Sequence, residues 1–178
     1  MSEKKNNRKN KKSHDILWAP WRLEYITDSH KNDDCIFCSL PKESDDKKNL
    51  IVYRNTHVFV IMNRYPYNNG HLMVVPYQHT SELSSLSNEE KLELFNSIQY
   101  SQQVLKKVMA PQGFNIGANL GTIAGAGIDT HIHFHLVPRW SGDTNYMPII
   151  SGTKVISESL SDTWDKLYKE FHKTRRKK

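Results

Sequence analysis

The stretch HIHFHLVPR, residues 131–139, decides the fold, because histidine alternates with apolar residues before a short apolar run. Alternate side chains of an extended strand share a face, so the pattern predicts a strand with His131, His133 and His135 on one face and apolar anchors on the other. Adjacent imidazoles would stand about 6.5–7 Å apart. Three in a row are costly for a purely structural face. The pattern therefore indicates a nucleophilic histidine, a metal site, or both on different histidines.

Four other short runs have the β-branched and aromatic composition of strands, and short links join the first three. Asn69 and Gly70 are strong turn formers ahead of the third run. Such short links favour an antiparallel arrangement. The expected strands are residues 51–55, 57–63, 71–76 and 114–120, in addition to 131–139.

Two helices are expected beside these strands. Ser87 and Glu90 have capping-box spacing at the start of a helix over residues 88–109. Its apolar stripe, predicted to pack on the sheet, is Leu92, Phe95, Ile98, Leu105 and Met109. Helical spacing of Trp164, Leu167, Tyr168 and Phe171 predicts a C-terminal helix. The sequence thus predicts an α+β fold: an antiparallel sheet of about five strands with a long helix and a C-terminal helix.

The positive charge of the chain is concentrated at its two ends. The 178 residues carry a formal net charge of +6, but residues 1–14 and 172–178 are strongly basic. We expect disordered tails there and one catalytic domain over 15–171, with the aromatic segment 15–26 docked on it as an arm. Charge carried in flexible ends is not the patch of a nucleic-acid-binding fold, so contact of the tails with nucleic acid is not favoured.

The sequence favours a cytoplasmic protein. No apolar run approaches the roughly 20 residues of a membrane span, and the N-terminal stretch lacks the apolar core of a signal peptide. Cys35 and Cys38 are the only cysteines, which suits a reducing compartment.

These cysteines form a Cys-x-x-Cys motif, which fits a redox pair or half of a zinc site. A redox pair is expected at a helix N-terminus after a buried strand, whereas this motif follows a polar lead-in, so zinc is favoured. Two more ligands are needed, and the candidates are His57, His71, His79 and His131.

A glycine-rich segment, residues 117–127, precedes the histidine strand. Without a Cβ, its backbone N–H groups can approach phosphate oxygens closely. Its position just before the histidines predicts a phosphate cradle.

Three segments resemble the histidine triad family of nucleotide hydrolases and transferases, whose signature is His-x-His-x-His followed by apolar residues. They are NRYPYNNGHLMVVPYQH (63–79), NLGTIAGAGID (119–129) and HIHFHLVPRW (131–140). LWAPWRLEYI (17–26), CIFC (35–38) and PRWSGDTNY (138–146) are most similar to the diadenosine tetraphosphate phosphorylase-like branch. The resemblance covers about residues 16–150.

The resemblance implies a role for individual residues. His133 would attack the α-phosphorus and carry a nucleotidyl intermediate, which water or inorganic phosphate then resolves. His135 and Asn119 would contact the phosphate or leaving group, and Asn63 the ribose. The remaining substrate-binding positions would be Gly125, Ala126, Gly127 and Trp140. A structural Zn²⁺ would be held by Cys35, Cys38, His79 and His131, with no organic cofactor, in a homodimer.

The implied function is cleavage of a dinucleoside polyphosphate. Neutral imidazole is abundant near pH 7, so a nucleophile is available without a strong base. Ala126 and Gly127 stand where many members of the family have Gln or Ser, which leaves hydrolysis and phosphorolysis both open. The alternatives are a non-catalytic nucleotide-binding module, hydrolysis of a nucleoside phosphoramidate, and a catalytic metal site on the histidines.

Overall fold

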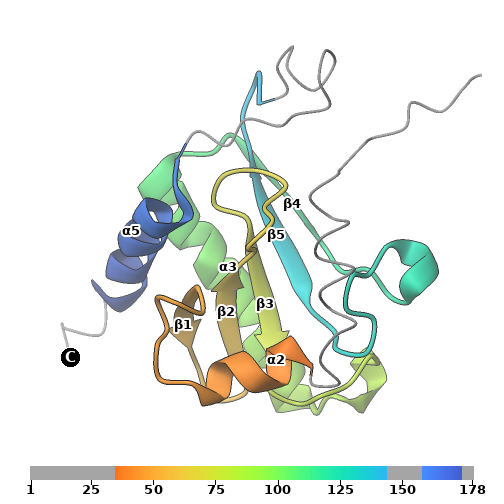
Figure 1. The fold of residues 1–178 in the computed structure, drawn as a ribbon. Coiled ribbons are helices and arrows are strands. Elements are labelled where there is room, and N and C mark those ends of the chain that lie inside the picture. The colour runs from red at the N-terminus through yellow and green to blue at the C-terminus, as the bar shows by residue number, and fades with distance from the viewer. Residues whose placement is uncertain (1–34, 144–157, 174–178) are drawn as a thin grey trace, which may run out of the picture.

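The fold is an antiparallel sheet between helical layers (Figure 1). The computed structural model describes residues 35–143 and 158–173. The predicted N-terminal tail and the aromatic segment 15–26 lie outside these residues, and the first two residues of the segment 172–178 end a helix.

Five strands form one sheet in the order β1-β2-β3-β5-β4, and each neighbouring pair is antiparallel. This confirms the predicted α+β class and sheet. The strands are β1 (Ile51–Arg54), β2 (Val58–Met62), β3 (Leu72–Pro76), β4 (Gly113–Gly117) and β5 (Phe134–Arg139). Every residue of β2 and β3 is buried, which places the core under the middle of the sheet.

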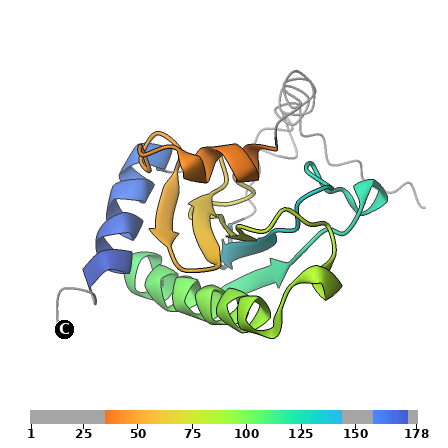
Figure 2. The ribbon, with the colours of Figure 1, turned by 90° about the horizontal axis from the view of Figure 1, so that it is seen from below.

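The long helix α3 (Asn88–Met109) lies along one face of the sheet, and the one-turn helix α2 (Ile36–Ser39) lies over the other (Figure 2). The helix α5 (Leu160–Lys173) packs against α3 and β1. Its Trp164 indole donates to the Ile51 carbonyl oxygen at 3.0 Å, which ties α5 to the edge of the sheet. Short 3-10 turns occur at Leu40–Lys42, Leu83–Ser85 and Thr122–Ala124.

The helix α3 has the predicted bounds and capping box, but part of its predicted apolar stripe does not face the sheet. Leu92 and Phe95 are 64% and 59% exposed. Two serines explain the rotation: Ser97 and Ser101 are buried, and the Ser101 hydroxyl donates to the Ser97 carbonyl oxygen at 2.7 Å. With the Ser101 hydroxyl satisfied within the helix, both serines share the buried face with Leu94, Ile98, Val104 and Leu105.

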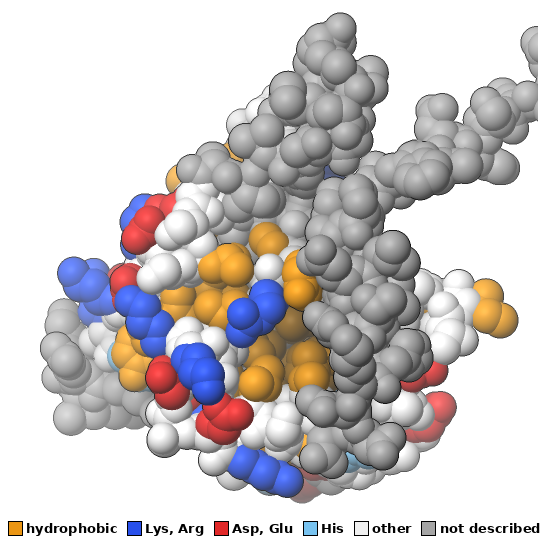
Figure 3. Space-filling model, viewed as in Figure 1, with side chains coloured by type: hydrophobic (Ala, Val, Ile, Leu, Met, Phe, Trp, Pro, Cys, Tyr) orange, Lys and Arg blue, Asp and Glu red, His pale blue; other side chains and the backbone are white. Residues whose placement is uncertain are grey.

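The face that carries α2 has a hydrophobic centre with acidic and basic side chains around it (Figure 3). Acidic and basic side chains alternate there, and ion pairs such as Lys47–Asp165 and Lys48–Glu43 occur among the described residues. The described part of this face therefore has no extended patch of a single charge. None of the described helices is long and apolar enough to cross a membrane.

Candidate active site

The predicted histidine strand is shorter than expected, because β5 begins at Phe134. His131 and His133 lie in the segment that leads into it, so the evenly spaced row of three imidazoles is wrong. Two hydrogen bonds hold this segment out of the ladder. The Ile132 N–H donates to the Thr80 carbonyl oxygen at 2.7 Å, and the ring of His133 turns back to the main chain of His131.

The ring of His133 has its tautomer fixed by the backbone. Its Nδ1 lies 2.9 Å from the His131 carbonyl oxygen, which can only accept, so Nδ1 carries the hydrogen and Nε2 carries the lone pair. Burial lowers the pKa of His133 below its usual value, although the bond to the carbonyl oxygen opposes this. The ring is therefore neutral at pH 7 and has a nucleophilic nitrogen at Nε2.

The ring of His135 has the opposite polarity because of His71. The Tyr67 N–H donates to Nδ1 of His71 at 3.1 Å, so the hydrogen of His71 lies on Nε2. That Nε2 lies 3.0 Å from Nδ1 of His135, which must accept, so the N–H of His135 lies on its own Nε2. His71 is 1% exposed, and the ring centroids of His133 and His135 are 4.9 Å apart. A lone pair and a hydrogen-bond donor thus stand side by side. The sequence suggests His71 only as a metal ligand, although its position directly before β3, which pairs with β5, places it beside the histidine strand.

The two cysteines lie beside two histidines, and these four residues are the set that the resemblance implied as zinc ligands. Cys35, Cys38, His79 and His131 place one ligand atom each within 4.8 Å of one another. α2 supplies the cysteine turn, in which the Cys38 N–H donates to the Cys35 carbonyl oxygen. His79 follows β3 and His131 precedes β5, so the antiparallel pairing of these strands brings them together. His57 and His71 are not members of the group.

The donor set and its spacing fit a tetrahedral zinc ion. The Nδ1 atom of His131 lies 3.3 Å from Sγ of Cys35 and 3.3 Å from Nδ1 of His79, and Sγ of Cys38 lies 3.2 Å from the latter. An ideal Cys₂His₂ zinc site separates its ligand atoms by about 3.3–3.8 Å. His131 Nε2 lies 2.9 Å from the Pro76 carbonyl oxygen and so carries the ring hydrogen, which leaves the lone pair on Nδ1 for a metal. Burial also lowers the pKa of His131.

The remaining residues predicted to bind substrate lie in different parts of the structure. Asn63 directly follows β2, and its N–H donates to the His71 carbonyl oxygen at 2.9 Å, close to the histidines. Asn119 lies in the glycine-rich loop, where its side chain donates to the Gly125 carbonyl oxygen at 3.4 Å. Gly125 has a φ of 88°, which favours glycine. Its N–H and that of Ala126 donate within the loop, to Thr122 and Gly121, so these groups must be released before they can hold phosphate.

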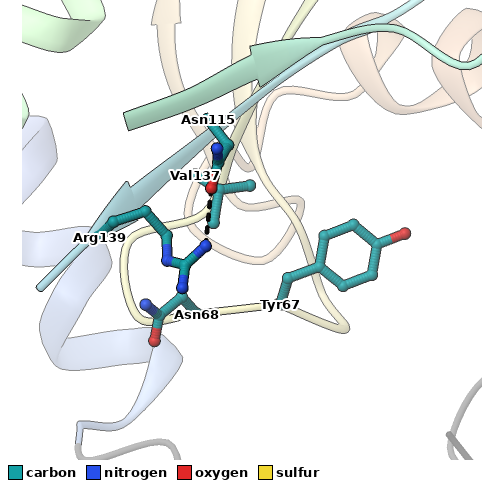
Figure 4. A pocket seen from close by; sticks show the side chains of 5 residues that line it. All are labelled: Tyr67, Asn68, Asn115, Val137 and Arg139. Atoms are coloured by element: carbon teal, nitrogen blue, oxygen red, sulfur yellow. Dashed lines mark hydrogen bonds between the residues drawn. The ribbon is translucent and has the colours of Figure 1, made fainter. Parts of the chain in front are cut away.

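The structure does not bring Trp140 to the histidines. It follows the far end of β5, and its indole donates to the Met109 carbonyl oxygen at 3.3 Å. Nearby lies a cavity of about 250 Å³, lined by Tyr67, Asn68, Asn115, Val137 and Arg139 (Figure 4). The Arg139 guanidinium donates to Asn115 and to both carboxylate oxygens of Asp143, so its charge is already compensated.

Comparisons with known proteins place the chain in a family. Residues 44–142, more than half of the chain, match the family model of the HIT domain. The chain is 44% identical to an AP-4-A phosphorylase of Mycobacterium tuberculosis over 155 residues, which are 83% of this chain and 79% of the relative. It is 33% identical to an asymmetrical bis(5'-nucleosyl)-tetraphosphatase of Schizosaccharomyces pombe over 52% of this chain and 50% of the relative.

A Zn-bound histidine triad family protein of Mycobacterium smegmatis has the same fold, with a TM-score of 0.63 and 20% identity over 82% of this chain and 98% of that protein. The structural likeness shows the fold, and the family-model match and the 44% identity show the family. The chain belongs to the HIT domain family.

Proposed function

We propose that the chain cleaves dinucleoside polyphosphates such as diadenosine tetraphosphate, through a nucleotide carried on Nε2 of His133. The observation that carries the proposal is the opposite polarity of two adjacent rings: a lone pair on His133 and an N–H on His135. The 44% identity to the M. tuberculosis AP-4-A phosphorylase supports the choice of substrate.

The reaction has two balanced steps. Nε2 of His133 forms a bond to the α-phosphorus, the bond from that phosphorus to the bridging oxygen breaks, and ATP leaves. The N–H of His135 donates to a phosphate oxygen and stabilises the charge that develops there. In the second step an acceptor takes the adenylyl group and restores the lone pair of His133. Inorganic phosphate would give ADP, and water would give AMP.

The test combines a covalent adduct with product analysis. Mass spectrometry of the protein mixed with diadenosine tetraphosphate should find an adenylyl group on His133 in the wild type and none in His133→Ala. That variant should lose turnover, while His57→Ala, at a histidine outside the cluster, should keep it. Products with and without added phosphate separate phosphorolysis from hydrolysis. Wild-type activity in His133→Ala would refute the mechanism, and binding without an adduct or turnover would identify a nucleotide-binding module.

We also propose that Zn²⁺ occupies the Cys₂His₂ cluster, where it would supply stability rather than chemistry. The lone pair of His131 and the ligand spacing support this role. Within the described residues the cluster is the only group of this kind, and it contains neither His133 nor His135. Thiolate ligands need a reducing environment, so we place the enzyme in the cytoplasm.

We further propose a homodimer in which β4 pairs with its copy. β4 is an edge of the described sheet, and Ile116 on it is 48% exposed. Ile116 pairs with Leu136, which faces away from His135 and toward α3, where Phe95 is also exposed. Antiparallel pairing of β4 with itself is self-complementary across a two-fold axis and would cover these residues in one interface.

A further inference from the structure

The residue His131 connects the metal cluster to the nucleophile. Its ring Nδ1 faces the two thiols at 3.3 and 3.5 Å, while its carbonyl oxygen accepts the hydrogen bond that fixes the tautomer of His133. Nε2 of the same ring donates to the Pro76 carbonyl oxygen. The carbonyl group that orients the nucleophile is therefore held in place by a side chain that belongs to the cluster.

A second connection runs through Phe37, which lies between the two cysteines on α2. Its side chain is 1% exposed. Its ring centroid lies 4.9 Å from that of His133 and 5.5 Å from that of His131. The ring of His135 packs edge-on against His133 at 4.9 Å, so the nucleophilic ring contacts both Phe37 and His135.

We propose that the Cys35–Cys38 turn, closed by its metal, positions the nucleophile: Phe37 supports the ring of His133, and His131 supplies the carbonyl oxygen that fixes its tautomer. The inference rests on the proposed role of His133 in catalysis. Phe37 is a positioning residue, because it contacts His133 and not the reacting phosphate.

The chemistry of the cluster explains why the metal matters to this arrangement. Two sulfur atoms and two ring nitrogens lie within 4.8 Å of one another. Without a cation, only weak S–H···N hydrogen bonds of the thiols to the ring nitrogens hold the turn, so we expect it to be less firmly fixed. Phe37 moves with that turn, because it is part of it. The ring of His133 then loses its support even in a chain that remains folded.

The first test observes His133 directly and needs no turnover. Two-bond ¹H–¹⁵N correlation spectra distinguish the two histidine tautomers, and His133→Ala assigns the signals. In the zinc-loaded wild type we expect one species of His133 with its hydrogen on Nδ1. In Phe37→Ala, and in His79→Ala, which lacks one metal ligand, we expect signals averaged between tautomers or split between conformers.

The second test measures kinetics in zinc-loaded protein. Misplacing a reacting group by about 1 Å can cost up to a hundredfold in rate, so we expect kcat to fall about tenfold in Phe37→Leu and further in Phe37→Ala. The KM should change little, because Phe37 does not contact substrate. The matched control is Ile36→Ala, a neighbouring residue of the same turn that is 37% exposed, and it should behave as wild type.

The outcomes separate this inference from the proposed function. Unchanged His133 signals in folded Phe37→Ala and His79→Ala would overturn the inference, as would unchanged kcat in both Phe37 variants. If the His79→Ala chain does not fold, the Phe37 variants decide the inference, because they keep all four ligands. If the wild type cleaves no dinucleoside polyphosphate, the proposed function fails, and the spectra still decide whether the turn orients His133.

Discussion

The three histidines of residues 131–135 differ in the group that hydrogen-bonds to one of their two ring nitrogens, and this group decides which nitrogen carries the hydrogen. The Pro76 carbonyl oxygen leaves His131 a lone pair toward the cysteines, and the His131 carbonyl oxygen leaves His133 a lone pair on Nε2. His71 instead donates to His135, so that ring carries its hydrogen on Nε2. One side-chain type can thus offer a metal ligand, a nucleophile and a hydrogen-bond donor, because a backbone carbonyl oxygen or the ring of His71 fixes each tautomer.

His71 is expected to control the hydrogen-bond donor on the ring of His135. In His71→Leu the hydrogen bond to Nδ1 of His135 is lost, and the second hydrogen-bond position of a neutral His135 ring is no longer defined. We expect kcat for diadenosine tetraphosphate to fall by about ten- to a hundredfold, with a much smaller change in KM. Steady-state kinetics measure both constants.

The conservative variant His71→Gln separates positioning from packing, because its amide nitrogen can replace Nε2 as the donor. It should recover part of the lost kcat. Thermal unfolding of both variants provides the control for stability, since a buried side chain is changed in each. Equal kcat in the Leu and Gln variants would show that His71 acts through packing alone.

Among the elements, the sequence predicts best those with complete local signals. The capping box of Ser87 and Glu90 is present, and α3 has the expected bounds, because caps and helical period are properties of neighbouring residues. The exposure of Leu92 could not be predicted in this way. Which side of α3 faces the sheet depends on how closely Ser97 and Ser101 approach it, and a pattern of apolar residues omits them.

The segment before β5 illustrates the same limit in the candidate site. Alternation predicted a strand from His131, but tertiary bonds to Thr80 and Pro76 and the approach of α2 hold His131 and His133 outside the ladder. Spacing alone leaves four histidines as candidate partners of the two cysteines, and only the resemblance selects His79 and His131. The role of His71 required coordinates, since it depends on atoms 64 residues apart in the chain.

Helix α2 carries the cysteine turn of the proposed zinc site. Loss of the metal from this site should lower the stability of the protein. We expect zinc to be present at one equivalent per chain in the wild type and absent in the double variant Cys35→Ser, Cys38→Ser. The melting temperature of that variant should fall by several degrees or more, because the binding energy of a structural metal is folding energy. Metal analysis and calorimetry measure these quantities.

The control for this prediction is Ser39→Ala, a change at the end of the same helix that leaves all ligands in place. It should retain zinc and melt close to the wild type. Full zinc content in the double cysteine variant would contradict the assignment of the cluster.

For the whole molecule, the open edge at β4 is the feature that most needs a partner. An unpaired edge strand exposes backbone donors and acceptors to other chains, and proteins usually cover or charge such edges. Here the edge carries Ile116, and Phe95 is exposed on the α3 side, so neither charge nor a described element protects it. Pairing of two copies would satisfy the backbone and bury the apolar residues together.

The wild type is therefore expected to scatter light as a particle of twice the 20.7 kDa mass of one chain. Ile116→Asp should dissociate it, since burying two unpaired carboxylates at a symmetric contact costs several kcal/mol, which corresponds to a Kd raised about a hundredfold or more. Ile123→Asp is the matched control, because this fully exposed residue lies in the glycine-rich loop and should leave the dimer intact. A monomeric wild type at micromolar concentration, or an Ile116→Asp chain with the wild-type mass, would refute pairing through β4. Because His133 and His135 lie on the opposite face of the sheet from Phe95, a dissociated but folded variant should still form the adenylyl adduct.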